Sequence, residues 1–125
     1  MNQKIETASA PEAIGPYSQA VKAGNTIYIS GQIPLVPSTS EFIGDDIKSQ
    51  TTQVLTNLSA ILEAAGANMS NVVKTTCLLK DMAHFAEMNE VYATFFSGTY
   101  PARATYQVVA LPKNALVEIE AIAVV

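Results

Sequence analysis

The element that decides the fold is residues 46–66, which read DIKSQTTQVLTNLSAILEAAG. Apolar side chains recur there at helical spacing and form one stripe: Ile47, Val54, Leu58, Ile61, Leu62 and Ala65. Asp45 offers an N-terminal cap, and Gly66 supplies the left-handed residue that commonly ends a helix. The pattern predicts an amphipathic helix at 46–65 that packs on a sheet.

Strands and one further helix are predicted on either side of this helix. Five segments have the composition or alternation of strands: 18–22, 26–32, 72–80, 102–109 and 116–124. A second apolar stripe predicts another helix at 84–97, and the stretch 34–44 is predicted to be a loop. The first two strands and the last two strands are each expected to form a hairpin, because short loops join them.

The order β-β-α-β-α-β-β predicts one α+β domain over residues 1–125. Both helices are expected on one face of the sheet, which leaves the other face uncovered. Apolar residues make up 49% of the chain and charged residues only 14%, where roughly 25% is usual. We therefore expect the uncovered face to be buried in a homo-oligomer.

The sequence carries no sign of export, membrane insertion or metal binding. No apolar run reaches the roughly 18 residues that cross a bilayer, and no secretory signal is visible, so a cytoplasmic location without a membrane partner is expected. The only cysteine, Cys77, and the only histidine, His84, cannot build a disulfide or a zinc site. Cys77 is predicted to be an inert buried thiol. A net charge of −4 argues against a nucleic-acid partner.

The last two predicted strands hold the most informative polar residues. Arg103, the only arginine, shares a strand face with Thr105, and Glu118 shares a face with Glu120. If the strands pair as a hairpin with their apolar faces together, Arg103 faces Glu120 at a Cβ separation of about 5 Å. Thr105 then faces Glu118.

This pair has two interpretations. It is a structural ion pair across two strands, or its guanidinium clamps the carboxylate of a substrate while the glutamate handles a water molecule. Spacing alone favours the structural interpretation without excluding the other.

Seven short stretches, taken jointly and in order, are highly specific. They are 15–20 (GPYSQA), 30–34 (SGQIP), 50–51 (QT), 57–58 (NL), 101–103 (PAR), 111–112 (LP) and 118–123 (EIEAIA). Through them the chain resembles the Rid family, also called YjgF-like proteins, over nearly its whole length. The resemblance implies a chorismate-mutase-like α+β fold and a homotrimer whose sheets pack around a central barrel, with clefts between neighbouring subunits.

The resemblance also implies an activity. Family members with an arginine at the position of Arg103 are expected to hydrolyse reactive 2-imino acids and enamines, such as 2-iminopropanoate and 2-iminobutanoate, to 2-keto acids and ammonia. Arg103 is implied to bind the substrate carboxylate and Glu120 to activate or orient the water, with no metal or organic cofactor. Pyridoxal-phosphate-dependent dehydratases are the implied source of such substrates.

Five further residues are implied to line the cleft: Tyr17, Ser30, Gly31, Asn89 and Thr105. From the residues alone, Tyr17 is equally a loop aromatic, Gly31 equally marks a β-bulge, and Asn89 faces solvent by default. The chain departs from the family at two positions, because Ala104 stands where serine is common and Thr105 where cysteine is common. A thiol contribution to the chemistry is therefore in doubt.

Two other functions remain open. The clefts of a non-catalytic module would bind or sense small 2-keto or amino acids without turnover. A ribonuclease or translation inhibitor is disfavoured by the acidic balance and by the lack of a basic groove with aromatic residues.

Overall fold

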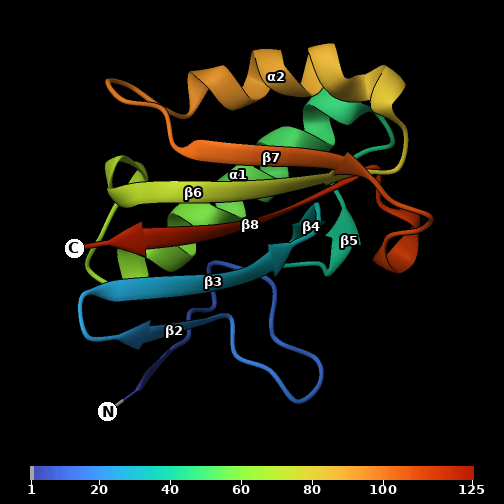
Figure 1. Ribbon diagram of the computed structural model, residues 1–125. Helices are drawn as coiled ribbons and strands as arrows, with labels where there is room; N and C mark the ends of the chain where they lie inside the picture. Colours follow the sequence, from blue (N-terminus) through green and yellow to red (C-terminus); the bar gives the residue numbers. More distant parts are fainter. Residues whose placement is uncertain (1) are drawn as a thin grey trace.

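One mixed sheet of six strands organises the molecule in the computed structural model, which describes residues 2–125 (Figure 1). The strands, in spatial order, are β1 (Gln3–Ile5), β2 (Ala20–Ala23), β3 (Thr26–Gln32), β8 (Val117–Val124), β6 (Val72–Leu79) and β7 (Ala102–Gln107). All neighbours are antiparallel except β6 and β7, which run parallel. A separate small hairpin pairs β4 (Leu35–Val36) with β5 (Glu41–Phe42).

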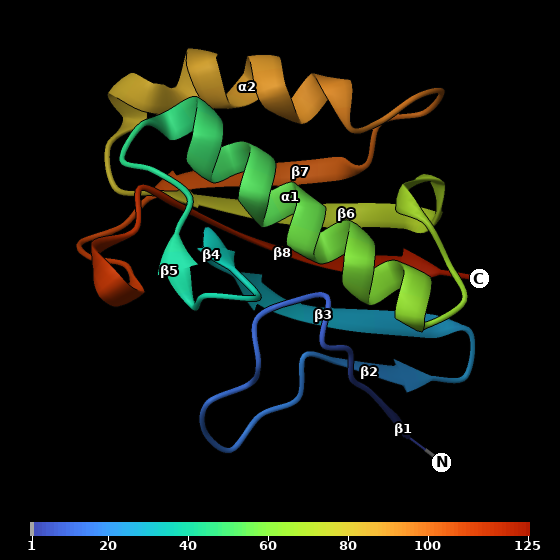
Figure 2. The same cartoon turned by 180° about the vertical axis from the view of Figure 1, so that it is seen from behind.

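Two helices lie on one face of this sheet, as predicted. Helix α1 (Ile47–Ala64) crosses the sheet diagonally, and α2 (Phe85–Thr94) lies beside it near the β7 edge (Figure 2). Short 3₁₀ turns, η1 (Met69–Asn71), η2 (Met82–His84) and η3 (Pro112–Asn114), connect the larger elements. The opposite face, which we call the open face, carries no covering layer (Figure 1).

Helix α1 begins and ends close to the predicted residues. Its N-cap is Asp46 rather than Asp45, since a carboxylate oxygen of Asp46 accepts a hydrogen bond of 2.9 Å from the backbone N–H of Ser49. Gly66, with φ +78°, follows the C-cap as predicted. The apolar stripe of α1 is buried against the inward residues of β3 and β8, and these side chains form the main core: Ile27, Ile29, Val54, Leu58, Ile61, Leu62, Ile119 and Ala121.

The predicted hairpin between the last two strands is wrong. Strand β6 lies between β7 and β8, so β7 pairs only with β6, in parallel. Helix α2 provides the crossover that two adjacent parallel strands require. Strand β8 instead occupies a central position, where its alternate apolar residues Val117, Ile119 and Ala123 are fully buried.

This strand order also overturns the predicted contacts of Arg103 with Glu120 and of Thr105 with Glu118. Arg103 stands beside Thr75 of β6, whereas Glu120 stands beside Thr76. Consecutive residues of a strand point to opposite faces of a sheet. Arg103 therefore lies on the helix face and Glu120 on the open face.

Smaller differences concern the ends of elements. The first predicted hairpin is present as β2 and β3, with Gly24 of its turn at φ +61°. Strand β1 was not predicted, and the predicted loop at 34–44 contains β4 and β5. The second helix, α2, begins one residue later than the predicted 84–97, directly after the 3₁₀ turn η2, and it ends three residues earlier, at Thr94. The strand at 72–80 is confirmed as β6.

Candidate functional site

A cluster around the only arginine lies at the edge of the helix face. The side chain of Arg103 leaves β7 towards α2, and its Nη1 donates a hydrogen bond of 2.7 Å to Oδ1 of Asn89. Its guanidinium carbon lies 4.8 Å from the ring centroid of Tyr92 and 5.5 Å from that of Phe85. Both distances are within the range of cation–π attraction. We call these four residues the arginine cluster.

The guanidinium of Arg103 has only neutral partners. Among residues 2–125, the ion pairs join Lys4 to Glu6 and Lys48 to Glu90, and none includes Arg103. Arg103 is exposed and borders a shallow hollow of about 430 Å³ together with Asn89, Tyr92 and Tyr100. A guanidinium held by neutral groups beside a hollow can bind an incoming carboxylate through two parallel hydrogen bonds.

Thr105 lies two residues further along β7, on the same strand face as Arg103. Its hydroxyl oxygen is buried and has no hydrogen-bond partner among the described residues. Cys77 stands beside Thr105 on β6 and is buried, as predicted. Burial raises the pKa of the Cys77 thiol to about 11, only partly opposed by the positive charge of Arg103. The thiol is therefore protonated and unreactive at neutral pH.

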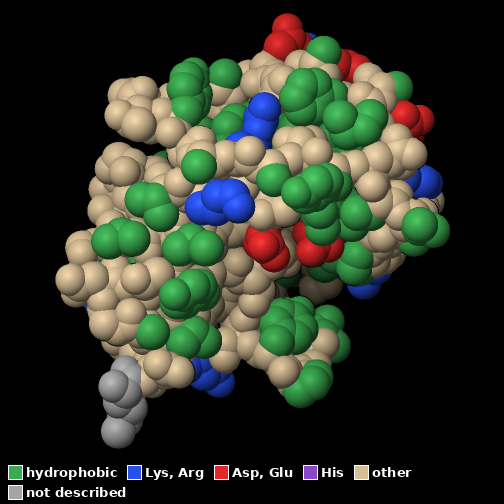
Figure 3. Space-filling model, in the orientation of Figure 1, with side chains coloured by type: hydrophobic (Ala, Val, Ile, Leu, Met, Phe, Trp, Pro, Cys, Tyr) green, Lys and Arg blue, Asp and Glu red, His purple; other side chains and the backbone are tan. Residues whose placement is uncertain are grey.

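A second polar group lies on the open face, along β3 and β8. Glu118 and Glu120 point out from this face of β8, and Figure 3 shows acidic side chains side by side near its middle. The pKa of Glu118 is raised, first by burial and then by the negative charge of Glu120. Glu120 and Ser30 border a hollow of about 330 Å³ with Ser18 and Tyr28.

Strand β3 bulges where it passes these carboxylates. Ile29 pairs with Ala121 and Gln32 with Ile119, so Ser30 and Gly31 together stand opposite Glu120. A Cβ at Gly31 would overlap the carboxylate of Glu118 and lie 2.9 Å from its Cδ. The interpretation of Gly31 as a bulge residue is thus confirmed, and the group that approaches it closely within this chain is Glu118.

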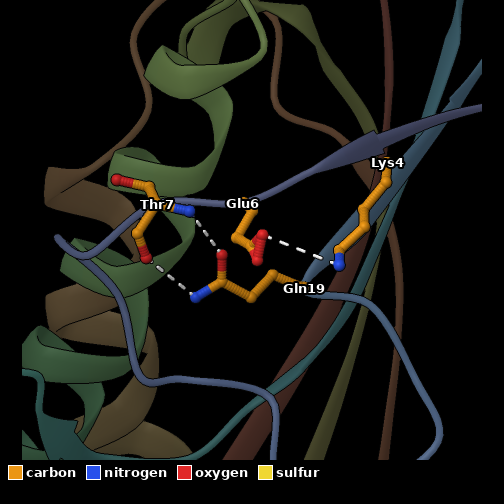
Figure 4. A network of polar contacts seen from close by, with 4 residues as sticks. All are labelled: Lys4, Glu6, Thr7 and Gln19. Carbon is orange, nitrogen blue, oxygen red and sulfur yellow. Dashed lines mark hydrogen bonds and ion pairs between the residues drawn. The ribbon is translucent and has the colours of Figure 1, made fainter.

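Tyr17 belongs to the loop between β1 and β2 and is 54% exposed. The buried side chain of Gln19 holds this loop (Figure 4): its Oε1 accepts a hydrogen bond of 2.7 Å from the backbone N–H of Thr7. Its Nε2 donates to backbone carbonyls, including that of Pro11 at 2.8 Å. The same figure shows the ion pair of Lys4 with Glu6, at 3.6 Å, on the adjoining surface.

The structure thus sorts the predicted site residues into two groups. Asn89 and Arg103 are in contact, and Ser30, Gly31 and Glu120 are neighbours on the open face. The two groups lie on opposite faces of the sheet. Sequence reasoning missed Tyr92 and Phe85 as partners of Arg103, because their apolar stripe predicted only core packing. The available signal was helical spacing: Phe85 lies four residues before Asn89 and Tyr92 three residues after it, which places all three on one face of the helix.

Comparisons with known proteins agree on one family. The family model described as Endoribonuclease L-PSP matches residues 7–125. The 2-iminobutanoate/2-iminopropanoate deaminase of Mus musculus is 56% identical over 120 residues, which cover 96% of this chain and 89% of that protein. The chain belongs to this family, which is the one its motifs predicted.

Solved structures give the same result. A Yersinia pestis protein of the conserved Rid family superposes with a TM-score of 0.97, at 48% identity over 100% of both chains. The Escherichia coli protein TdcF, solved with bound serine, superposes with a TM-score of 0.95, at 45% identity over 98% of both chains. The α+β fold predicted from the family resemblance is confirmed. Within residues 2–125, none of the helices has the length and apolar character to span a membrane.

Proposed function

We propose that this protein hydrolyses small 2-imino acids, such as 2-iminopropanoate and 2-iminobutanoate, to 2-keto acids and ammonia. The observation that carries the proposal is the guanidinium of Arg103, which is oriented by neutral groups and left without a carboxylate partner in the described chain. A 2-imino acid supplies that carboxylate next to its electrophilic carbon. The activity named for the mouse relative supports the same substrate class.

Arg103 anchors the substrate carboxylate, and Glu120 holds a water molecule against the imine carbon. Glu120 removes a proton as the water oxygen bonds to that carbon. Glu120 returns this proton to the amino nitrogen of the resulting carbinolamine. The C–N bond then breaks and releases ammonia, while the hydroxyl group gives up its proton to Glu120 and its C–O bond becomes the double bond of the keto group. No metal or organic cofactor is needed, because the iminium carbon is already an electrophile and the protein supplies orientation and a base.

The two groups must come from different copies of the chain to act on one molecule. Arg103 lies on the helix face and Glu120 on the open face. The open face also exposes Tyr28 and Tyr106, at 52% and 57%, which a neighbouring copy would cover. We therefore place the active site in clefts of a homotrimer whose sheets pack around a central barrel.

Each cleft takes residues from two protomers. Asn89 and Thr105 accompany Arg103 on one side, and Ser30, Gly31 and Tyr17 accompany Glu120 on the other. The enzyme acts in the cytoplasm on imines released by pyridoxal-phosphate-dependent dehydratases. These enzymes form 2-aminoacrylate from serine, and the binding of serine by the relative TdcF supports a ligand that carries an amino-acid carboxylate.

The first test is pyruvate formation from freshly generated 2-aminoacrylate, with wild type and with Arg103→Ala. Loss of the guanidinium is expected to lower kcat/KM about 10²-fold, since hydrogen bonds to charged groups contribute about 1.5–3 kcal/mol. Arg103→Lys is the matched control, because it keeps the positive charge and loses the bidentate hydrogen bonding of the guanidinium to a carboxylate. Circular dichroism checks that the variants are folded. A folded wild type that does not accelerate the reaction would instead support a module that binds 2-keto acids without turnover.

The description of the family as an endoribonuclease makes RNA cleavage the second candidate function. The net charge of −4 opposes it, because RNA binding relies on neutralising phosphates. Incubation of the pure protein with labelled single-stranded RNA tests it directly. Cleavage by wild type and not by the Arg103→Ala variant would favour this second function.

A further inference from the structure

Tyr92 is fixed in place beneath the arginine. The side chain is only 5% exposed, and its hydroxyl forms a hydrogen bond of 2.7 Å with Oγ1 of Thr75. Thr75 is 1% exposed, so this bond is shielded from water. The ring also packs against Phe96 at a centroid separation of 4.7 Å. A ring held at both its hydroxyl end and its side has little freedom to turn.

One face of this ring supports Arg103. The guanidinium carbon lies 4.8 Å from the ring centroid, closer than it is to the ring of Phe85. Thr75, which anchors the hydroxyl of Tyr92, is the register neighbour of Arg103 in the β6–β7 pair. The pairing of β6 with β7 therefore sets the positions of both Arg103 and Thr75, the residue that holds the ring of Tyr92.

We propose that Tyr92 is a positioning residue that holds the Arg103 guanidinium in the orientation that receives a carboxylate. This inference rests on the proposed role of Arg103 in substrate binding. An arginine side chain loses about 2 kcal/mol of rotamer entropy when it is held in one place. Tyr92 and Asn89 hold it before the substrate arrives, so less ordering remains for the binding step.

Three substitutions separate positioning from core packing. Tyr92→Phe keeps the ring face and loses the bond to Thr75, and Thr75→Val loses the same bond from the other side. Tyr92→Leu keeps an apolar side chain and loses the ring face. We expect Tyr92→Leu to raise KM for 2-iminopropanoate about 5-fold with little change in kcat, because a cation–π contact is worth about 1 kcal/mol. Tyr92→Phe and Thr75→Val keep the ring face against Arg103 and the packing of the ring on Phe96, so they are expected to retain most of the affinity.

A direct readout comes from the side chain of Arg103 itself. Because the chain has one arginine, its Nε–H group gives a single, unambiguous NMR signal. In wild type and Tyr92→Phe this group is expected to be ordered, with its proton shifted by the ring. In Tyr92→Leu the part of the shift that comes from the Tyr92 ring disappears, and the order parameter of the group falls towards values of flexible groups, below about 0.6. This measurement needs no enzymatic activity.

A double-mutant cycle completes the test. In the Arg103→Ala background, Tyr92→Leu is expected to leave the affinity for pyruvate, measured by calorimetry, unchanged. The proposal is overturned if Tyr92→Leu leaves the Arg103 signal ordered, or weakens pyruvate binding equally in both backgrounds. If the wild type shows no hydrolysis while the Arg103 signal still depends on Tyr92, the deaminase proposal fails and the positioning role stands.

Discussion

The arginine cluster and the two glutamates of the open face, Glu118 and Glu120, differ in how far other residues of the same chain surround them. Three residues of α2, Phe85, Asn89 and Tyr92, contact the guanidinium of Arg103. Glu118 and Glu120 have no covering layer, and the surface around them is hollowed and partly apolar (Figure 3). The difference teaches that the half proposed to bind the substrate carboxylate is assembled within one chain, whereas the half proposed to hold the water has no covering surface in that chain.

The largest expected effect comes from mixing two inactive variants. Glu120→Gln alone should lower kcat by about 10²–10⁴-fold, the contribution of a general base. Arg103→Ala alone fails to anchor the substrate. If both are co-expressed and assort at random, about one quarter of the intersubunit sites regain both groups by symmetry. The measurement is the rate of pyruvate formation per site in the mixed oligomer.

The control for this mixture is wild type co-expressed with the double variant Arg103→Ala/Glu120→Gln. Sites shared between copies give about one quarter of full activity in both mixtures. Sites within one copy give about one half in the control and none in the mixture of single variants. The second pattern would refute a site formed by two protomers.

A smaller effect is expected at the bulge that faces Glu118 and Glu120. Gly31→Ala places a methyl group against the carboxylate of Glu118, and such overpacking typically costs about 1–3 kcal/mol. Glu118→Ala removes the obstacle, so Gly31→Ala should then cost much less. Urea denaturation of the single and double variants measures this coupling.

Gly44→Ala is the matched control for this cycle, because its Cβ would lie 3.4 Å from the nearest side-chain atom. It is expected to change stability little. An equal loss of stability for Gly31→Ala with and without Glu118 would show that the contact with Glu118 is not the reason for glycine at this position.

The smallest expected effect is the pH dependence that Glu118 contributes to stability. Its pKa is raised in the folded state, so the folded protein binds the proton more tightly than the unfolded chain. The stability that this tighter proton binding contributes to the folded state is fully present below the ordinary pKa of 4.5. It is lost as pH rises through the raised pKa of Glu118. Glu118→Gln is therefore expected to have a higher Tm than wild type at pH 7 and no such advantage near pH 4.

Asp46 provides a control of opposite sign. Its hydrogen bonds with Ser49 lower its pKa, so its carboxylate stabilises α1 above the ordinary value of 3.8. Asp46→Asn should thus be less stable than wild type at pH 7, and the difference should shrink as pH falls through the lowered pKa. Thermal melts from pH 3 to pH 8 measure both variants. A pH-independent difference for Glu118→Gln would contradict the buried-carboxyl account.

The sequence predicted where each helix and strand lies in the chain better than it predicted which strands lie side by side. The helix at 46–65 was predicted within one residue at each end, because a cap, an apolar stripe and a glycine stop all act locally. The strands at 102–109 and 116–124 were also found, and their buried faces were assigned correctly for β8. Their pairing was wrong, because a short loop suggested a hairpin and nothing local indicated that β6 would lie between them.

The site residues follow the same division. The family resemblance predicts Arg103, Asn89, Glu120 and Gly31 as site residues, whereas the apolar stripe predicts Tyr92 only as part of the core. A buried aromatic with one ring face against a cation has the same sequence signature as an ordinary core aromatic. The contact between Tyr92 and Arg103 depends on how α2 sits over β7, and sequence periodicity does not describe that placement.

By itself, the sequence determined the positions of the two helices and of the five longer strands, the faces that α1 and β8 bury, and the family to which the chain belongs. The period of apolar residues records the side of each element that meets the core. Only the tertiary structure decided that β6 separates β7 from β8, and hence that Arg103 and Glu120 lie on opposite faces of the sheet. Strand order depends on pairing between segments far apart in the chain, and a shift by one position in a neighbouring strand reverses the face on which a side chain lies.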